Sequence, residues 1–174
     1  SISTGQLLDL TRDAKTEAIQ AAADFVPLTN AIAAMEKAVR DLRLTVTADN
    51  IRLSFATVMR YADFDKAMTH LLKQLKQLAT LLEDQAERSE GLENCRQRAA
   101  SHLYLIQRWH DEIDMQGYVR WIEVYHQAMQ LHATPLSIAE IFQKQMMSSL
   151  RTWIFTSATL SVKKDFSHFN HEMG

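Results

Sequence analysis

The feature that most constrains the fold of this chain is a run of apolar residues that recur alternately four and three positions apart. The members of this run are Phe64, Met68, Leu71, Leu75, Leu78 and Leu82. Because this spacing places their side chains on one face of an α-helix, it predicts a long helix with a continuous apolar face. A second run follows a turn at Gly91 and consists of Leu92, Cys95, Ala99, Leu103, Ile106, Trp109 and Ile113. We therefore predict two long helices that pack antiparallel as a hairpin.

Two further helices are predicted ahead of this hairpin. Ser3 and Gln6 have the spacing of a capping box, and the helix that begins there should end at Pro27. A second helix should begin at Thr29 or Asn30, since both residue types cap helices well. Its apolar stripe consists of Ile32, Met35, Val39, Leu42 and Val46. These helices and the hairpin should share one core.

After Gly117 the sequence changes character. Residues 118–125 are rich in aromatic and β-branched side chains, residues 128–133 alternate between apolar and polar, and both segments are predicted to be strands. A helix should follow, with a capping box formed by Ser137 and Glu140. Residues 152–156 are predicted to form a strand covered on both faces, because Trp153, Ile154 and Phe155 are apolar in succession.

The predicted fold class is therefore mainly α: long antiparallel helices in a bundle or hairpin, followed by a small β-α-β segment. Within the helical part, residues 51–62 are predicted to form a short helix. The domain boundary should lie between residues 1–116 and residues 117–174. Because two or three strands do not make a stable parallel sheet by themselves, we expect the remaining strands to come from outside this chain, which favours a piece of a longer protein.

Composition narrows the possible classes. The chain has 174 residues, 47% of them hydrophobic, which is enough for a real core, and its net charge of -2 argues against binding to nucleic acid through bulk charge. The only cysteine, Cys95, excludes an internal disulfide and a thiolate metal cluster built from this chain alone. No apolar run reaches the about 18 residues that span a bilayer. These features lead us to expect a cytoplasmic protein without membrane association.

A string of small hydroxyl residues follows the last predicted strand. In open α/β sheets, ligands bind beyond the carboxyl ends of the strands, which is where Ser157, Ala158 and Thr159 would lie. The two hydroxyls can donate and accept hydrogen bonds, and the alanine keeps the backbone accessible to whatever lies opposite. The alternative is that these residues only end the strand and cap the next helix.

The surrounding sequence favours the first interpretation. The stretch W-I-F-T-S-A-T-L-S, with L-H-A-T-P-L ahead of it and Y-V-R-W-I-E-V at the exit of the helical region, resembles the DinG-like branch of the XPD/DinG family of superfamily-two DNA helicases. S-T-G-Q-L-L-D-L-T-R-D-A at the start is similar to the segment that follows the D-E-A-H box in these proteins. The resemblance covers essentially the whole chain, although the helical middle matches mainly by length and position.

This resemblance implies a function. Members of the family are ATP-dependent 5′ to 3′ DNA helicases with two RecA-like motor domains, the first of which contains an inserted arch domain. On this basis residues 1–116 correspond to the arch, and residues 117–174 to a partial motor domain. Ser157, Ala158 and Thr159 match the S-A-T motif, which couples the nucleotide state to strand displacement and is not itself catalytic.

The family resemblance also sets expectations for cofactors and partners. The complete helicase should use ATP and Mg²⁺, and the cysteines of an iron-sulfur cluster, where present, would lie upstream. Its partners should be single-stranded DNA and replication or DNA repair proteins, and the truncated chain should self-associate if truncation exposes apolar surface. Because the sequence contains neither a G-x-x-x-x-G-K-[ST] phosphate loop nor a D-E-A-H box, this chain alone should not hydrolyse ATP.

A basic stripe is the candidate nucleic-acid contact. Lys66, His70, Lys73 and Lys76 are spaced so that they share one face of the third long helix. Such a stripe can neutralise phosphates of a passing strand. The alternative is an ordinary solvated surface, since charged residues on the outer face of a helix usually only interact with water.

A second functional hypothesis is a non-enzymatic interaction module, in which the hairpin of residues 63–113 binds a protein partner. Other chemistry has little support. His102 and His110 lack the spacing of a metal-binding helix, so no metal site is predicted. The three tryptophans lie on apolar faces and are predicted to pack in the core; they are Trp109, Trp121 and Trp153.

Overall fold

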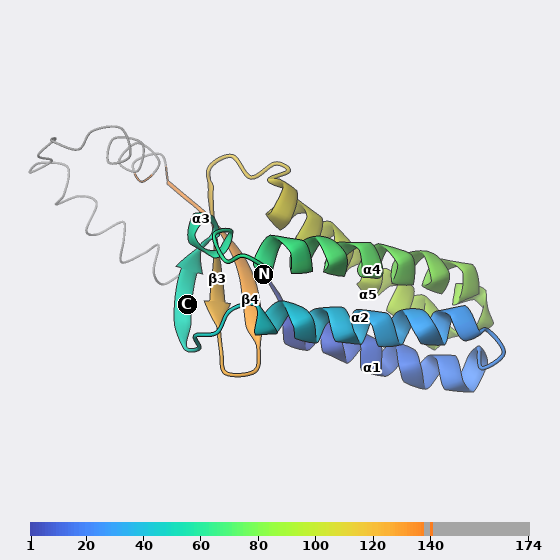
Figure 1. Cartoon of the computed structure of the whole chain (residues 1–174). Coiled ribbons are helices and arrows are strands. Elements are labelled where there is room, and N and C mark those ends of the chain that lie inside the picture. The colour runs from blue at the N-terminus through green and yellow to red at the C-terminus, as the bar shows by residue number, and fades with distance from the viewer. Residues whose placement is uncertain (138–139, 141–174) are drawn as a thin grey trace, which may run out of the picture.

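The computed structural model describes residues 1–137 and Glu140. Within this part of the chain, long helices form an antiparallel bundle, and a small sheet lies at one end of it (Figure 1). The long helices are α1 (Thr4–Ala21), α2 (Val26–Leu44), α4 (Phe64–Gln85) and α5 (Glu90–Asp111). The strands are β1 (Ile2–Ser3), β2 (Ile51–Ser54), β3 (Tyr118–Val124) and β4 (Met129–Pro135). The short elements are α3 (Phe55–Val58) and the 3-10 helix η1 (Ala86–Arg88). The predicted fold class, mainly α with a small β segment, is confirmed.

Helix α4 forms the centre of the bundle. All six residues of its predicted apolar stripe, from Phe64 to Leu82, are fully buried, and the helix packs against both α2 and α5. A stripe that repeats every three or four residues can contact two neighbouring helices at once, which explains this central position. The predicted α4–α5 hairpin is confirmed, with η1 as its connection.

The ends of the helices agree only in part with the prediction. The capping box at Ser3 is present, because the Ser3 amide donates to Gln6 Oε1 at 2.8 Å and the Gln6 amide donates to Ser3 Oγ at 3.1 Å. The predicted helix end at Pro27 is wrong, since α1 ends at Ala21 and Pro27 lies in the first turn of α2. Proline is tolerated there because the first amides of a helix have no helical acceptor to bond.

The sheet is antiparallel throughout, with the strand order β1-β4-β3-β2. Strands β3 and β4, which were both predicted as strands, pair antiparallel as a hairpin, in which Ile122 pairs with Leu131. The predicted helix over residues 51–62 is wrong for its first four residues, which form β2 and place Leu53 opposite Ile122. Alternation of apolar and polar side chains along β2 turns Ile51 and Leu53 toward the core, and this favours a strand.

The expectation that the sheet lacks partners within this chain is also wrong for the described residues. Strands β1 and β2 come from the helical part of the sequence and flank the β3–β4 hairpin on both sides. They pair with residues far away along the chain, so local sequence patterns give no sign of the pairing. The parallel β-α-β unit itself, with its second strand over residues 152–156, lies outside the described residues. Its capping box is present, with the Ser137 amide donating to Glu140 Oε2 at 2.8 Å.

Trp109 joins the bundle to the sheet. Its indole N–H donates to the carbonyl of His132 on β4 at 2.8 Å, and its ring meets the Phe55 ring edge-on, with the centroids 5.0 Å apart. The interpretation of Trp109 and Trp121 as core residues is confirmed, because each is 3% exposed. Trp153 lies outside the described residues.

Candidate nucleic-acid interface

The predicted basic stripe lies on the outer face of α4. Lys66, His70, Lys73 and Lys76 are all exposed, on the side of the helix away from its buried face. In the part of the chain that the structure describes, none of the four takes part in an ion pair. The charges of the three lysines are therefore available to an anionic ligand.

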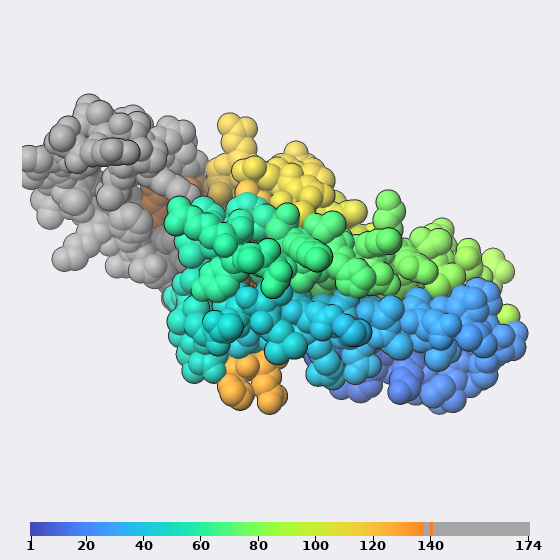
Figure 2. Space-filling model, viewed as in Figure 1, coloured from blue at the N-terminus to red at the C-terminus, as the bar shows by residue number. Residues whose placement is uncertain are grey.

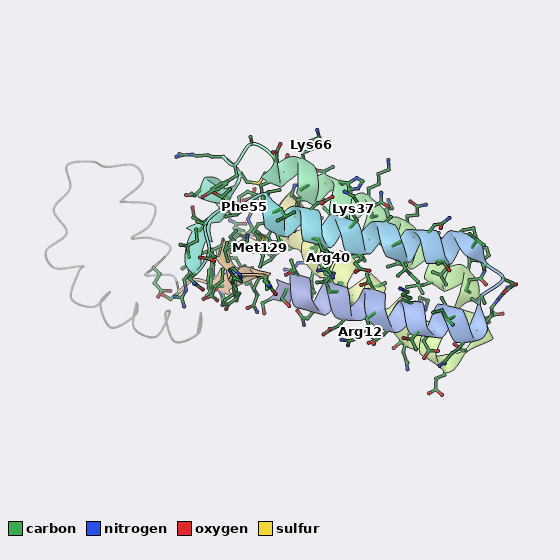
Figure 3. All side chains as sticks on the ribbon, turned by 60° about the horizontal axis from the view of Figure 1, so that its bottom comes forward. Arg12, Lys37, Arg40, Phe55, Lys66 and Met129 are labelled. Atoms are coloured by element: carbon green, nitrogen blue, oxygen red, sulfur yellow. The ribbon has the colours of Figure 1, made fainter. Side chains whose placement is uncertain are left out.

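Helix α2 continues this basic surface. It packs beside α4, and Figure 2 shows the two helices side by side along one face of the molecule. Lys37 projects from α2 on the side where α4 carries Lys66 (Figure 3). Unlike the lysines of α4, Lys37 has an acidic partner on its own helix, Asp41 Oδ2, at 2.7 Å. Lys37 is not identified by a local sequence pattern, because such a pattern does not reveal which helices lie side by side.

Charge is segregated along α4. Lys66 and Lys73 lie in the half nearer the sheet and Lys76 lies near the middle. Exposed Glu83 and Asp84 lie at the far end, followed by Glu87 in η1. The acidic end of the bundle repels phosphate groups, while the half next to the sheet attracts them. Any nucleic-acid contact of α4 is therefore favoured close to the sheet.

His110 contacts the carboxylate that lies at the start of this basic half. Asp65 precedes Lys66, and its Oδ1 lies 2.6 Å from His110 Nε2 on α5. The other ring nitrogen of His110 lies 2.7 Å from Asp111 Oδ1. Both nitrogens are thus engaged by direct hydrogen bonds to carboxylates. Among the described residues, no group of three or more histidine, cysteine or acidic side chains is arranged to hold a metal ion.

The remaining candidate residues fall into two groups. Ser157, Ala158 and Thr159 lie outside the described residues. Cys95 is buried in the bundle, and this burial raises the pKa of its thiol. As the single cysteine of the sequence, it cannot supply the set of thiolates that an iron-sulfur cluster requires. Among the described residues, no helix has the length and apolar character needed to cross a membrane.

Comparison with known proteins supports the resemblance. Two curated proteins described as ATP-dependent DNA helicase YoaA, from Haemophilus influenzae and Escherichia coli, are each 29% identical to this chain. The alignments cover 100% of this chain and 27% of each relative. The resemblance to DinG-like helicases is confirmed. No family model and no solved structure matches the chain. The chain therefore spans about a quarter of the curated relatives that it matches.

Proposed function

We propose that this chain is part of an ATP-dependent 5′ to 3′ DNA helicase of the DinG/XPD type. The main support for this proposal is similarity along the entire chain to two proteins described as ATP-dependent DNA helicases. In this proposal residues 1–116 belong to an arch inserted into the first motor domain, and residues 117–174 return into that motor domain. The protein acts in the cytoplasm, in DNA replication or repair.

The basic stripe provides the DNA contact in this proposal. Lys66, Lys73 and Lys76 are exposed and free of ion pairs among the described residues, and they rise from a helix whose opposite face is fixed in the core. A single strand that passes along α4 would release condensed counterions at each phosphate that a lysine neutralises. The contact requires no recognition of bases, which suits a motor that must move along any sequence.

The S-A-T motif provides the coupling between nucleotide state and strand displacement. The hydroxyls of Ser157 and Thr159 would hydrogen-bond to an acidic box encoded outside this chain, and so bias the motor toward one of its conformations. ATP and Mg²⁺ would bind to residues elsewhere in the helicase, because this sequence has no phosphate loop and no D-E-A-H box. An iron-sulfur cluster, where the helicase has one, would likewise be held by cysteines outside this chain.

The proposal is tested with the complete protein that contains this chain. We expect Mg²⁺- and ATP-dependent unwinding of a duplex with a 5′ single-stranded overhang, and no unwinding of the same duplex with a 3′ overhang. Residues 1–174 alone should show no ATP hydrolysis above background and only weak, salt-sensitive DNA binding. Absence of DNA-stimulated ATP hydrolysis in the complete protein, or turnover by the isolated chain, would contradict the proposal.

A further inference from the structure

A groove beside the sheet combines an aliphatic floor with basic edges. It lies between the first turns of α1, the last turns of α2 and the turn that joins β3 to β4, and its volume is about 700 Å³. Leu8, Val39, Leu44 and Val46 line its apolar part. Arg40, at the edge, lies between the α1 and α2 ribbons in Figure 3. We call this hollow the α1–α2 groove; its volume is in the range of sites that bind specific ligands.

Leu44 is the feature of the groove that most needs a partner. Its side chain is 74% exposed, which is the largest exposed fraction among the large hydrophobic residues of the described chain. An isolated exposed leucine is common, but this one adjoins a groove with half-buried Leu8 on its other side, so that an apolar partner would remove both leucines from water together.

The walls of the groove are fixed in the unbound protein. The guanidinium of Arg43 donates to the carbonyl of Tyr125 at 2.7 Å, to that of His126 at 3.1 Å and to that of Val46 at 2.7 Å. These bonds connect the β3–β4 turn to the end of α2. In Figure 1 this turn, in orange, lies near the end of α2 that is next to the sheet. His126 Nδ1 adds a contact to Asp49 Oδ2 at 2.9 Å. A groove that is already formed loses little conformational entropy when it binds a ligand.

The charges around the groove favour an acidic ligand. Its charged lining residues are Arg40, Arg43 and Asp49, so the lining carries a net positive charge, although Arg40 is also paired with Glu36 at 3.2 Å. Among the described residues, Arg43 has no carboxylate partner, because its guanidinium is bonded only to backbone carbonyls. Acidic residues that flank an apolar segment would therefore be attracted to this edge.

A protein segment fits the groove better than a nucleic acid does. No tryptophan, tyrosine or phenylalanine is among its lining residues, so bases would find no stacking surface. Aliphatic side chains from an amphipathic helix, by contrast, match the floor directly.

We propose that the α1–α2 groove binds a short acidic segment of another protein, whose leucine or isoleucine side chains cover Leu44. The proposal is independent of the helicase function, because it concerns a surface that the basic stripe on α4 does not share. It assigns a specific site to a protein partner, on α1 and α2 and not on the α4–α5 hairpin.

The test is a selection from a displayed library of random peptides on the immobilised complete protein. Peptides that bind should be enriched in leucine or isoleucine together with aspartate or glutamate. One such peptide, labelled with a fluorophore, is then titrated by anisotropy against the protein and its variants. We expect Leu44→Glu to weaken binding at least about ten-fold, which is the scale of a lost central apolar contact combined with a like charge.

Matched controls separate the groove from general effects. Ile19→Glu places the same charge on a similarly exposed aliphatic residue, 65% exposed and near the opposite end of α1, and should leave affinity unchanged. Arg40→Glu should weaken binding of the acidic peptide. The same change should strengthen binding of a peptide in which the acidic residues are replaced by lysine. Neither Leu44→Glu nor Ile19→Glu should change ATP-dependent unwinding.

Several outcomes would overturn the proposal. One is a selection that yields no binder or only basic sequences. Another is peptide binding that Leu44→Glu and Ile19→Glu weaken equally, or that does not depend on residue 44. Loss of binding to a single-stranded oligothymidylate in the Leu44→Glu variant, without competition by the peptide, would assign the groove to nucleic acid and likewise reject a protein partner.

Discussion

The guanidinium carbon of Arg120 lies 3.5 Å from the centroid of the Phe55 ring, so that a charged group of β3 covers an aromatic ring of α3. The same guanidinium donates to the carbonyl of Trp109 at 2.6 Å, near the C-terminal end of α5, and lies 3.3 Å from Glu112. Only 10% of its side chain is exposed, and burial lowers the pKa of Arg120. Arg120 thereby links the end of a bundle helix to the sheet.

Replacement of Arg120 by lysine should destabilise this link. Lysine keeps the charge but lacks the flat face over Phe55 and the donors that reach the end of α5, so we expect unfolding free energy to fall by about 1–3 kcal/mol. Urea unfolding followed by circular dichroism measures the change. The control is Arg60→Lys, at an exposed residue that has no ion pair among the described residues. This variant should change the unfolding free energy by less than about 0.5 kcal/mol. Equal stability of the Arg120→Lys variant and the parent would show that the contacts of Arg120 with Phe55 and with the end of α5 do not stabilise the fold.

The basic stripe makes a quantitative prediction for DNA binding. Replacing Lys66, Lys73 and Lys76 by glutamine in the complete protein should weaken binding to single-stranded DNA, and should reduce the slope of log affinity against log salt by up to about 2. The matched control removes exposed charges from α1, as Arg12→Gln and Lys15→Gln, and should leave the slope nearly unchanged. A slope that stays the same after the α4 changes would remove α4 from the DNA interface.

Features set by a single helix or strand are predictable from this sequence, whereas features set by contacts between distant segments are not. The buried face of α4 was predictable because its spacing is set by a single helix, and the same regularity placed Lys66 and Lys73 on the outside. Strand β2 was missed because what stabilises it is pairing with β3, and Leu53 is distant from Ile122 along the chain. Pro27 wrongly predicted a helix end, because proline is also common in the first turn of a helix.

The two surfaces of the molecule show the same distinction. Lys37 joins the basic stripe, and Leu44 joins the α1–α2 groove, only through the packing of α2 against its neighbours. A sequence pattern identifies which face of α2 is exposed, but it does not identify what lies across from that face. Surfaces to which several helices or strands contribute can therefore be identified only from the structure.

Two half-buried histidines should make stability depend on pH. Burial lowers the pKa of His102 and that of His132 from the ordinary value of 6.5, so the unfolded chain binds protons more readily than the folded protein does. The unfolding free energy should therefore be highest above pH 6.5 and fall as the pH decreases through the lowered pKa values. Urea unfolding across this range measures the trend.

The variant His102→Leu isolates one of these contributions. Nδ1 of His102 is buried without a hydrogen-bond partner among the described residues, and the nearby charge of Arg98 also lowers the pKa of the ring. The difference in unfolding free energy between the variant and the parent should be constant above pH 6.5. Below that pH it should shift in favour of the variant, because leucine takes up no proton on unfolding. A difference that does not vary with pH would contradict the role of His102.

The S-A-T motif makes a prediction about coupling. If the proposed function is correct, Ser157→Ala or Thr159→Ala in the complete protein should leave ATP binding nearly intact, while the rate of unwinding should fall more than the rate of hydrolysis. The reason is that a lost hydroxyl changes how strongly the nucleotide state biases the motor conformation, and removes no group that binds phosphate. The ratio of unwinding to hydrolysis is the quantity to measure, with Ser161→Ala as a control for loss of a nearby hydroxyl. If both rates fell equally, the hydroxyls would have to act on the chemical step, and a coupling role would be wrong.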